Sequence, residues 1–92
     1  MITIVIPTFN EIKNISTIIN QLLIIDFSSD FEIIIVDDNS SDGTAEKVRE
    51  LVHNDKRIRL INRVGRSGLS SAIKEGCLCA SGELVVVMDA DG

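Results

Sequence analysis

Short apolar runs along this chain alternate with segments of mixed polarity. The runs at 1–6, 31–36 and 84–88 are rich in Ile and Val, which is typical of strands buried on both faces. A further run at 57–61 alternates Arg with apolar residues and predicts a strand near the edge of a sheet. Pro7, the only proline, is predicted to end the first strand because it cannot donate a hydrogen bond to a neighbouring strand.

The three segments between these strands carry apolar residues at spacings of three and four. This spacing predicts helices with one apolar face against a sheet. The apolar stripes are Ile12, Ile15, Ile19 and Leu22, then Ala45, Val48, Leu51 and Val52, and finally Leu69, Ala72, Ile73, Gly76 and Ala80. Four strands that alternate with three helices predict an α/β fold, a three-layer α/β/α sandwich around a Rossmann-like, mostly parallel sheet.

Length and charge restrict the classes of function. A chain of 92 residues forms at most one small domain, and its net charge of −5 disfavours a nucleic-acid partner. No apolar run approaches the roughly 20 residues of a membrane-spanning helix, and no secretion signal begins the chain. We therefore expect a cytoplasmic protein, or one at the cytoplasmic face of the membrane if the chain belongs to a longer protein.

Polar and acidic residues follow three of the predicted strands, at 7–11, at Asp37 and Asp38, and at Asp89 and Asp91. Ligand sites of parallel sheets lie beyond the carboxyl ends of the strands, so these residues are expected to converge on one crevice. Two acids as close as Asp89 and Asp91 repel each other unless a cation lies between them. They predict a divalent metal site, for Mg²⁺ or Mn²⁺, and a substrate rich in phosphate oxygens.

The chain lacks the glycine-rich motifs that cradle phosphates, because neither GxGxxG nor GxxxxGK occurs. A nucleotide would therefore be held by side chains and metal, with Asp38 free to accept hydrogen bonds from a base or ribose. Four segments, IVIPTFNE, EIIIVDDNSSDGT, GLSSAIKEG and VVVMDADG, resemble in order and spacing the N-terminal half of inverting family 2 glycosyltransferases of GT-A fold. Within that family the chain is most similar to polyprenol or dolichol phosphate mannosyl- or glucosyltransferases.

The resemblance covers essentially all of the chain and implies a function. Residues 1–92 are then the nucleotide-sugar-binding portion of a GT-A domain, cut after its DxD motif. The implied reaction is the metal-dependent, inverting transfer of a hexose from GDP-mannose or a UDP-sugar to an acceptor such as a polyprenyl phosphate or a saccharide. The acceptor-binding half would lie beyond Gly92, so the catalytic residues are unknown and the fragment is expected to be inactive alone.

The resemblance also implies which residues contact the nucleotide. Pro7, Phe9 and Glu11 match the loop that borders it, and Phe9 stands where the family often has Tyr, so a hydroxyl contact is lost. Val36 and Asp38 match the pair that contacts the base, with Asp38 as the hydrogen-bonding partner.

The diphosphate end of the predicted site lies at the last strand. Asp89, Ala90 and Asp91 match the DxD signature, whose acids hold the metal on the diphosphate, and Asp91 is the first choice for a direct ligand. Arg66 is the loop arginine expected to stabilise the departing nucleoside diphosphate.

Several of these residues have a structural alternative. Asp37 is expected to cap the following helix rather than to contact a ligand, and Glu11 would also interact favourably with a helix dipole. Arg63 is expected to be a solvated loop charge, and the same interpretation competes with the phosphate role of Arg66.

Two other functions remain open at this point. The VVVMDADG segment also resembles the DxDG nucleophile motif of haloacid dehalogenase-like phosphatases, although that motif normally follows the first strand. The second alternative is a non-catalytic nucleotide-binding fragment. An unprotected edge at the fourth strand is also expected to permit pairing with another copy of the chain, as a homo-oligomer.

Overall fold

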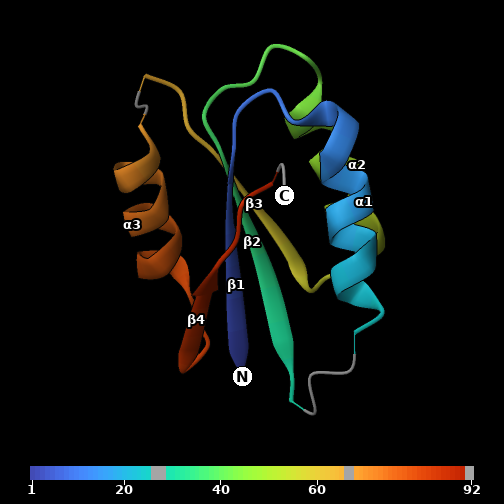
Figure 1. Cartoon of the computed structure of the whole chain (residues 1–92), viewed down its shortest axis with the longest axis vertical. Helices are drawn as coiled ribbons and strands as arrows, with labels where there is room; N and C mark the ends of the chain where they lie inside the picture. Colours follow the sequence, from blue (N-terminus) through green and yellow to red (C-terminus); the bar gives the residue numbers. More distant parts are fainter. Residues whose placement is uncertain (26–28, 66–67, 91–92) are drawn as a thin grey trace.

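The computed structural model describes residues 1–25, 29–65 and 68–90 (Figure 1). Its elements, in chain order, are β1 (Ile2–Thr8), α1 (Ile12–Leu23), β2 (Phe31–Asp37), α2 (Thr44–Asn54), β3 (Ile58–Asn62), α3 (Leu69–Cys79) and β4 (Leu84–Val87). The strands form one sheet in the order β3-β2-β1-β4, and every pair of neighbours is parallel. The predicted alternation of four strands and three helices is confirmed.

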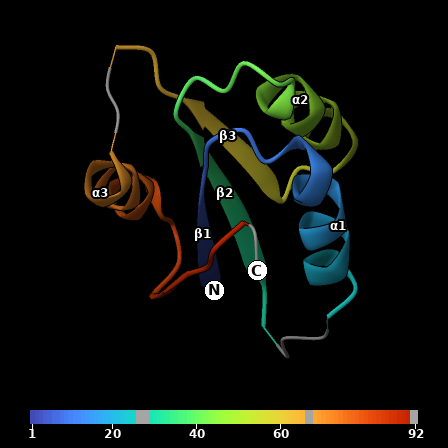
Figure 2. The same ribbon diagram turned by 45° about the horizontal axis from the view of Figure 1, so that its top comes forward.

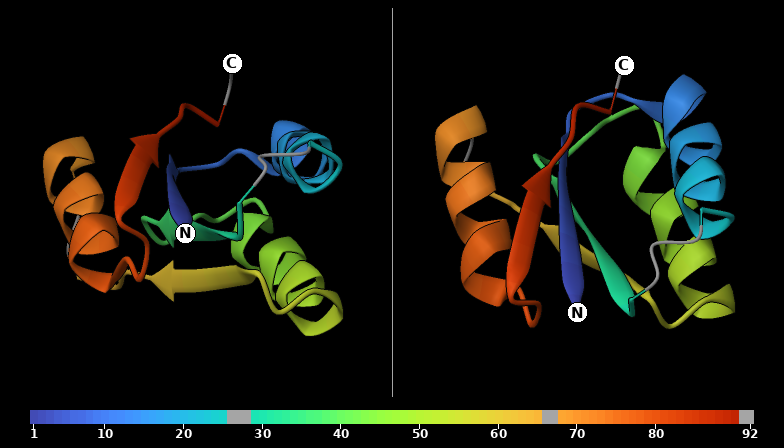
Figure 3. Two further views of the ribbon diagram at one scale, coloured as in Figure 1. Left: turned by 90° about the horizontal axis from the view of Figure 1, so that it is seen from below. Right: turned by 60° about the horizontal axis from the view of Figure 1, so that its bottom comes forward.

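Helices cover both faces of this sheet, as predicted. Figure 3 shows α1 and α2 on one side and α3 on the other. Successive residues of a strand point to opposite faces, so Ile4 and Ile6 pack in the core beneath α1 and α2, whereas Val5 packs with Val36 and Ala72 beneath α3. The described helices include none that is both long and apolar enough to cross a membrane.

Pro7 does not end the first strand, because β1 continues through it to Thr8. The amide of Met88 donates to the carbonyl of Val5, and the amide of Asp38 donates to the carbonyl of Thr8. Odd residues at this end of β1 therefore face β4, and even residues face β2. The nitrogen of Pro7, which carries no hydrogen, faces the β4 side of the strand. The pairing of β1 with β4 ends before this position, so the proline removes no hydrogen bond from the ladder.

The burial of β4 on both faces was wrongly predicted. Its residues Leu84, Val86 and Val87 are 57%, 39% and 45% exposed. The strand lies at the edge of the sheet and pairs only with β1, and no described strand covers its outer side. The apolar composition of a run does not reveal which position the strand takes in the sheet. The edge position predicted for β3 is confirmed.

Candidate functional site

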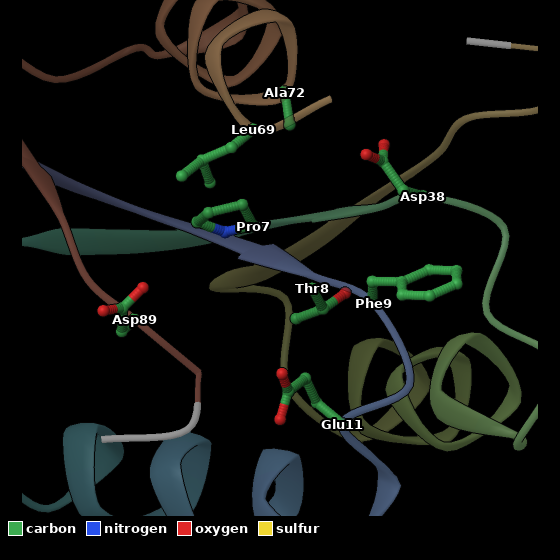
Figure 4. Close-up of a pocket in the computed structure, with 8 residues that line it drawn as sticks. All are labelled: Pro7, Thr8, Phe9, Glu11, Asp38, Leu69, Ala72 and Asp89. Carbon is green, nitrogen blue, oxygen red and sulfur yellow. The ribbon is translucent and has the colours of Figure 1, made fainter. Parts of the chain in front are cut away.

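The carboxyl ends of β1, β2 and β4 and the start of α3 border a pocket of about 210 Å³. Figure 4 shows its walls. The residues that line it are Pro7, Thr8, Phe9, Glu11, Asp38, Leu69, Ala72 and Asp89. The three strand tips that the sequence predicted to converge therefore share one cavity.

Five of the residues predicted to bind a nucleotide sugar line this pocket: Pro7, Phe9, Glu11, Asp38 and Asp89. They come from three separate stretches of the chain, brought together by the pairing of β1 with both β2 and β4. In Figure 4 the carboxylates of Asp38, Glu11 and Asp89 approach the cavity from different sides.

Two other predicted residues, both described, do not line this pocket. Val36 is completely buried beneath α3, and Ala90, which is 3% exposed, packs in the core on the opposite face of the sheet. Arg66 and Asp91 lie outside the described residues. The roles assigned to these four residues stay predictions.

Sequence reasoning missed the wall formed by the start of α3. Leu69, at the first position of the helix, is 62% exposed, and Ala72 follows on the same helix. A large apolar side chain left exposed at the carboxyl end of a sheet is a signal for a binding surface. It was hidden in the sequence because Leu69 also fits the apolar stripe of α3.

The loops that follow β1 and β2 lie at the same end of the sheet (Figure 2), and hydrogen bonds join them. The amide of Asn10 donates to Oγ of Ser40 at 2.7 Å, and the amide of Ser41 donates to Oδ1 of Asn10 at 2.9 Å. Asn10 and Asn39 both have positive φ angles, 54° and 58°, a conformation that Asn tolerates better than most residues. These contacts hold Phe9 beside the end of β2.

A second set of bonds joins the starts of α1 and α2. The amide of Glu11 donates to Oγ1 of Thr44 at 2.9 Å, and the amide of Ile12 donates to Oδ2 of Asp42 at 3.1 Å. The amide of Thr44 donates to Oδ1 of Asp42 at 3.0 Å. Loss of hydration raises the pKa of Asp42, but the hydrogen bonds from Thr44 and Ile12 outweigh it and leave that pKa below its ordinary value. Much of the polar 37–44 segment therefore shapes the loops and does not face the pocket.

Asp37 is one of these structural residues. It is fully buried, and its carboxylate accepts hydrogen bonds from Oγ1 of Thr8 at 2.6 Å and from the amide and hydroxyl of Ser40 at 2.9 and 2.6 Å. It caps the turn after β2 and not α2, which begins only at Thr44. This position agrees with the prediction that Asp37 has a structural role and does not contact a ligand.

Asp38 faces the pocket and pairs on its other side with Arg63. Oδ1 of Asp38 lies 2.7 Å from Nε of Arg63, and Oδ2 accepts a hydrogen bond from the amide of Gly68 at 3.1 Å. The side chain of Arg63 is completely buried, so its prediction as a solvated loop charge was wrong. Sequence reasoning missed this pair because it depends on the register of β3 against β2, in which Asp37 pairs with Asn62 and the next residues leave the sheet side by side.

Among the described residues that line the pocket, Asp89, Glu11 and Asp38 offer carboxylate oxygens, which hard cations prefer, and none offers a thiol or an imidazole. Asp89 is exposed and lies two residues after the end of β4. Asp91, its predicted partner, is outside the described residues, and among those that are described no three potential ligands cluster closely enough to hold a metal ion.

Comparison with known proteins shows which family the chain belongs to. Residues 3–92 match the family model described as glycosyl transferase family 2. The chain belongs to this family. Its sheet is the Rossmann-like part of a GT-A fold, and the haloacid dehalogenase-like alternative is excluded, because the family match includes the DADG segment up to residue 92.

Named relatives resemble the chain over almost its whole length. It is 37% identical over 92 residues to a dolichol-phosphate mannosyltransferase of Saccharomyces cerevisiae, and 39% identical over 90 residues to one of Pyrococcus furiosus. These matches cover 97% and 98% of this family 2 chain but only 34% and 25% of the relatives. The chain thus spans about a quarter to a third of their length.

Two solved structures share the backbone of this chain. A mannosyltransferase from Pyrobaculum calidifontis, in complex with GDP-Man and Mn²⁺, superposes with a TM-score of 0.89 at 31% identity and covers 98% of this chain and 27% of the other. The TarS protein of S. aureus in complex with UDP superposes with a TM-score of 0.84 at 29% identity, again over 98% of this chain and 27% of that one.

Proposed function

We propose that this family 2 chain binds a nucleotide-diphosphate sugar, GDP-mannose or a UDP-sugar, as the donor-binding part of a hexosyltransferase. The observation that carries the proposal is that Asp38, after β2, and Asp89, after β4, line one pocket on either side of β1. The related structures with GDP-Man and Mn²⁺ and with UDP support it.

The pocket is suited to the base end of such a donor. Phe9 is 58% exposed and offers an aromatic surface, while Asp38 offers a hydrogen-bond acceptor. A volume of about 210 Å³ is below the range of roughly 300–1,000 Å³ for complete ligand sites. It accommodates part of a nucleotide, with the diphosphate extending past Glu11 to Asp89.

Asp89 and Asp91 are the residues proposed to hold a divalent cation, Mg²⁺ or Mn²⁺. When bound, the cation supplies positive charge to the diphosphate and makes it a better leaving group. Arg66 is proposed to act on the same charge. The chain's own contribution is to orient the donor, with Asp38 on the nucleoside and the acids after β4 at the diphosphate.

The acceptor is proposed to be a polyprenyl phosphate, because relatives named dolichol-phosphate mannosyltransferase match this chain at 37% and 39% identity. A phosphate oxygen is already anionic, so its attack on the anomeric carbon needs no strong general base. The attack comes from the face opposite the nucleoside diphosphate and inverts the anomeric configuration. We expect the chain alone to bind donor without transferring the sugar.

Calorimetric titration with GDP and UDP, in Mn²⁺ or in EDTA, tests donor binding. We expect at least one nucleotide to bind, with affinity about tenfold or more higher in Mn²⁺. Asp89→Ala should remove most of this metal dependence, and Asp91→Ala should abolish the Mn²⁺-dependent binding. Glu83→Ala is the matched control, because Glu83 is an exposed acid at the opposite end of β4 and should leave binding unchanged. Equal affinity with and without metal contradicts the metal-dependent site.

A further inference from the structure

Arg63 is a buried charge directly behind the wall of the pocket. It follows β3, beside Asp38 at the end of β2, and none of its side chain is exposed. A buried guanidinium that loses its partner is strongly destabilising, so the charge of Arg63 requires a nearby carboxylate. Asp38, with Oδ1 at 2.7 Å from Nε, is the closer of its two carboxylate partners.

The guanidinium is held in place from α3 as well. Nη2 donates to Oγ of Ser71 at 2.7 Å and contacts the carbonyl of Gly68 at 3.5 Å, and Nη1 lies 3.8 Å from Oε1 of Glu75. The amide of Gly68 in turn donates to Oδ2 of Asp38. One oxygen of Asp38 therefore contacts Arg63, and the other accepts a hydrogen bond from Gly68, whose carbonyl contacts Arg63. These two contacts fix the orientation of the carboxylate.

This orientation restricts what Asp38 can recognise. Oδ1 is buried against Arg63, so Oδ2 is the oxygen that a ligand in the pocket can reach. An ion-paired carboxylate only accepts hydrogen bonds. Uracil and guanine carry a ring N–H that can donate to it, whereas cytosine and adenine have a ring-nitrogen lone pair at the corresponding position, which a carboxylate repels.

We propose that Arg63 is a positioning residue that fixes Asp38 as an acceptor and thereby gives the pocket a preference for uracil and guanine nucleotides over cytosine and adenine nucleotides. The inference rests on the proposed function, because it assumes that a nucleoside diphosphate occupies the pocket. Arg63 acts through Asp38 and does not itself line the cavity.

A second arginine provides a matched control. Arg59 of β3 pairs with Glu32 of β2 through Nη1 and Oε1 at 3.0 Å and also donates to the carbonyl of Cys79 at 2.9 Å. Like Arg63, it joins β2, β3 and α3, but Glu32 lies at the opposite end of β2 from Asp38. Losing it should affect stability without affecting the choice of base.

The experiment measures the affinities of UDP, CDP, GDP and ADP by calorimetry in Mn²⁺, for the wild-type chain and for Arg63→Met, Arg63→Lys and Arg59→Met. Urea unfolding establishes the folded fraction of each variant. We expect the wild type to prefer UDP over CDP, or GDP over ADP, by about tenfold or more. Arg63→Met should reduce this ratio of affinities to within about twofold of unity. Arg63→Lys should retain part of the preference, and Arg59→Met should retain all of it.

Loss of stability alone lowers every affinity together, so the ratio separates positioning from folding. If Arg63→Met does not fold, Arg63→Lys decides, and Asp38→Asn must lose the same preference. A folded Arg63 variant with the wild-type ratio overturns the inference while the proposed function stands, and so does a wild type without any preference. A wild type that binds none of the four nucleotides overturns both.

Discussion

Gly76 of α3 lies against Val5 of β1, so close that a Cβ on the glycine would stand 2.4 Å from Cγ1 of the valine. The contact sets the distance between the helix and the sheet, and with it the position of Leu69 and Ala72 at the pocket. Gly76 is therefore needed for the close packing of α3 against β1.

Gly76→Ala is predicted to destabilise the chain, although alanine is the better helix former. Helix propensity favours the substitution by up to about 1 kcal/mol, whereas overpacking costs about 1–3 kcal/mol and such a short contact lies at the upper end. We expect a net loss of about 1–2 kcal/mol in the free energy of unfolding, measured in urea. In a double-mutant cycle, Val5→Ala should offset part of this loss. Strictly additive effects would show that the two residues do not share the contact.

Thr44→Val tests the bonds between the two loops. Thr44 is fully buried, and valine keeps its shape but cannot accept the hydrogen bond from the amide of Glu11. We expect a loss of about 1–2 kcal/mol in stability and weaker nucleotide binding, because Glu11 and Phe9 are no longer held beside Asp38. Thr17→Val, at an exposed position of α1, should change stability by less than about 0.5 kcal/mol. An unchanged stability in Thr44→Val would contradict the structural role of this bond.

The environment of Glu32 predicts that the folded chain loses stability in acid. Burial raises the pKa of its carboxyl, but hydrogen bonds from the amide of Ser81 and the hydroxyl of Thr3, together with Arg59, outweigh burial and hold that pKa below the ordinary 4.5. A folded-state pKa below the unfolded one stabilises the fold above pH 4.5, and this stabilisation is lost as the pH falls through the folded-state value.

Urea unfolding of wild type and Glu32→Gln between pH 7 and about pH 3 measures this contribution. The wild type should be the more stable at neutral pH, and the difference should shrink as the pH falls. Glu50→Gln, which removes an exposed partner of Lys47, should follow the wild type throughout. A constant difference between wild type and Glu32→Gln across this range would contradict the assigned pKa direction.

Phe9→Ala is predicted to weaken nucleotide binding without a loss of stability. The phenyl ring is 58% exposed and lines the pocket, so little packing is lost on its removal. Stacking of a base on an aromatic ring contributes roughly 1–3 kcal/mol, which corresponds to about a 5- to 150-fold loss of affinity. Calorimetry with UDP and GDP measures it. Phe9→Tyr is the control and should bind at least as tightly, and an unaffected Phe9→Ala would place the base elsewhere.

The sequence alone determined the helices and strands of this fold and the strand ends that carry its polar residues. Runs of Ile and Val, and apolar stripes at helical spacing, are local signals, and they predicted each strand and helix to within a few residues. Parallel topology then brought Phe9, Asp38 and Asp89 to one end of the sheet, because the strands all run in the same direction.

Tertiary structure decided what depends on position across the sheet. The exposure of β4 follows from its place at the edge, and the pairing of Arg63 with Asp38 follows from the register of β3 against β2. Both involve residues distant in the sequence, so neither leaves a periodic pattern in it. Whether Arg63 is solvated or buried beside Asp38 depends on this register, and the register is fixed only when β3 pairs with β2.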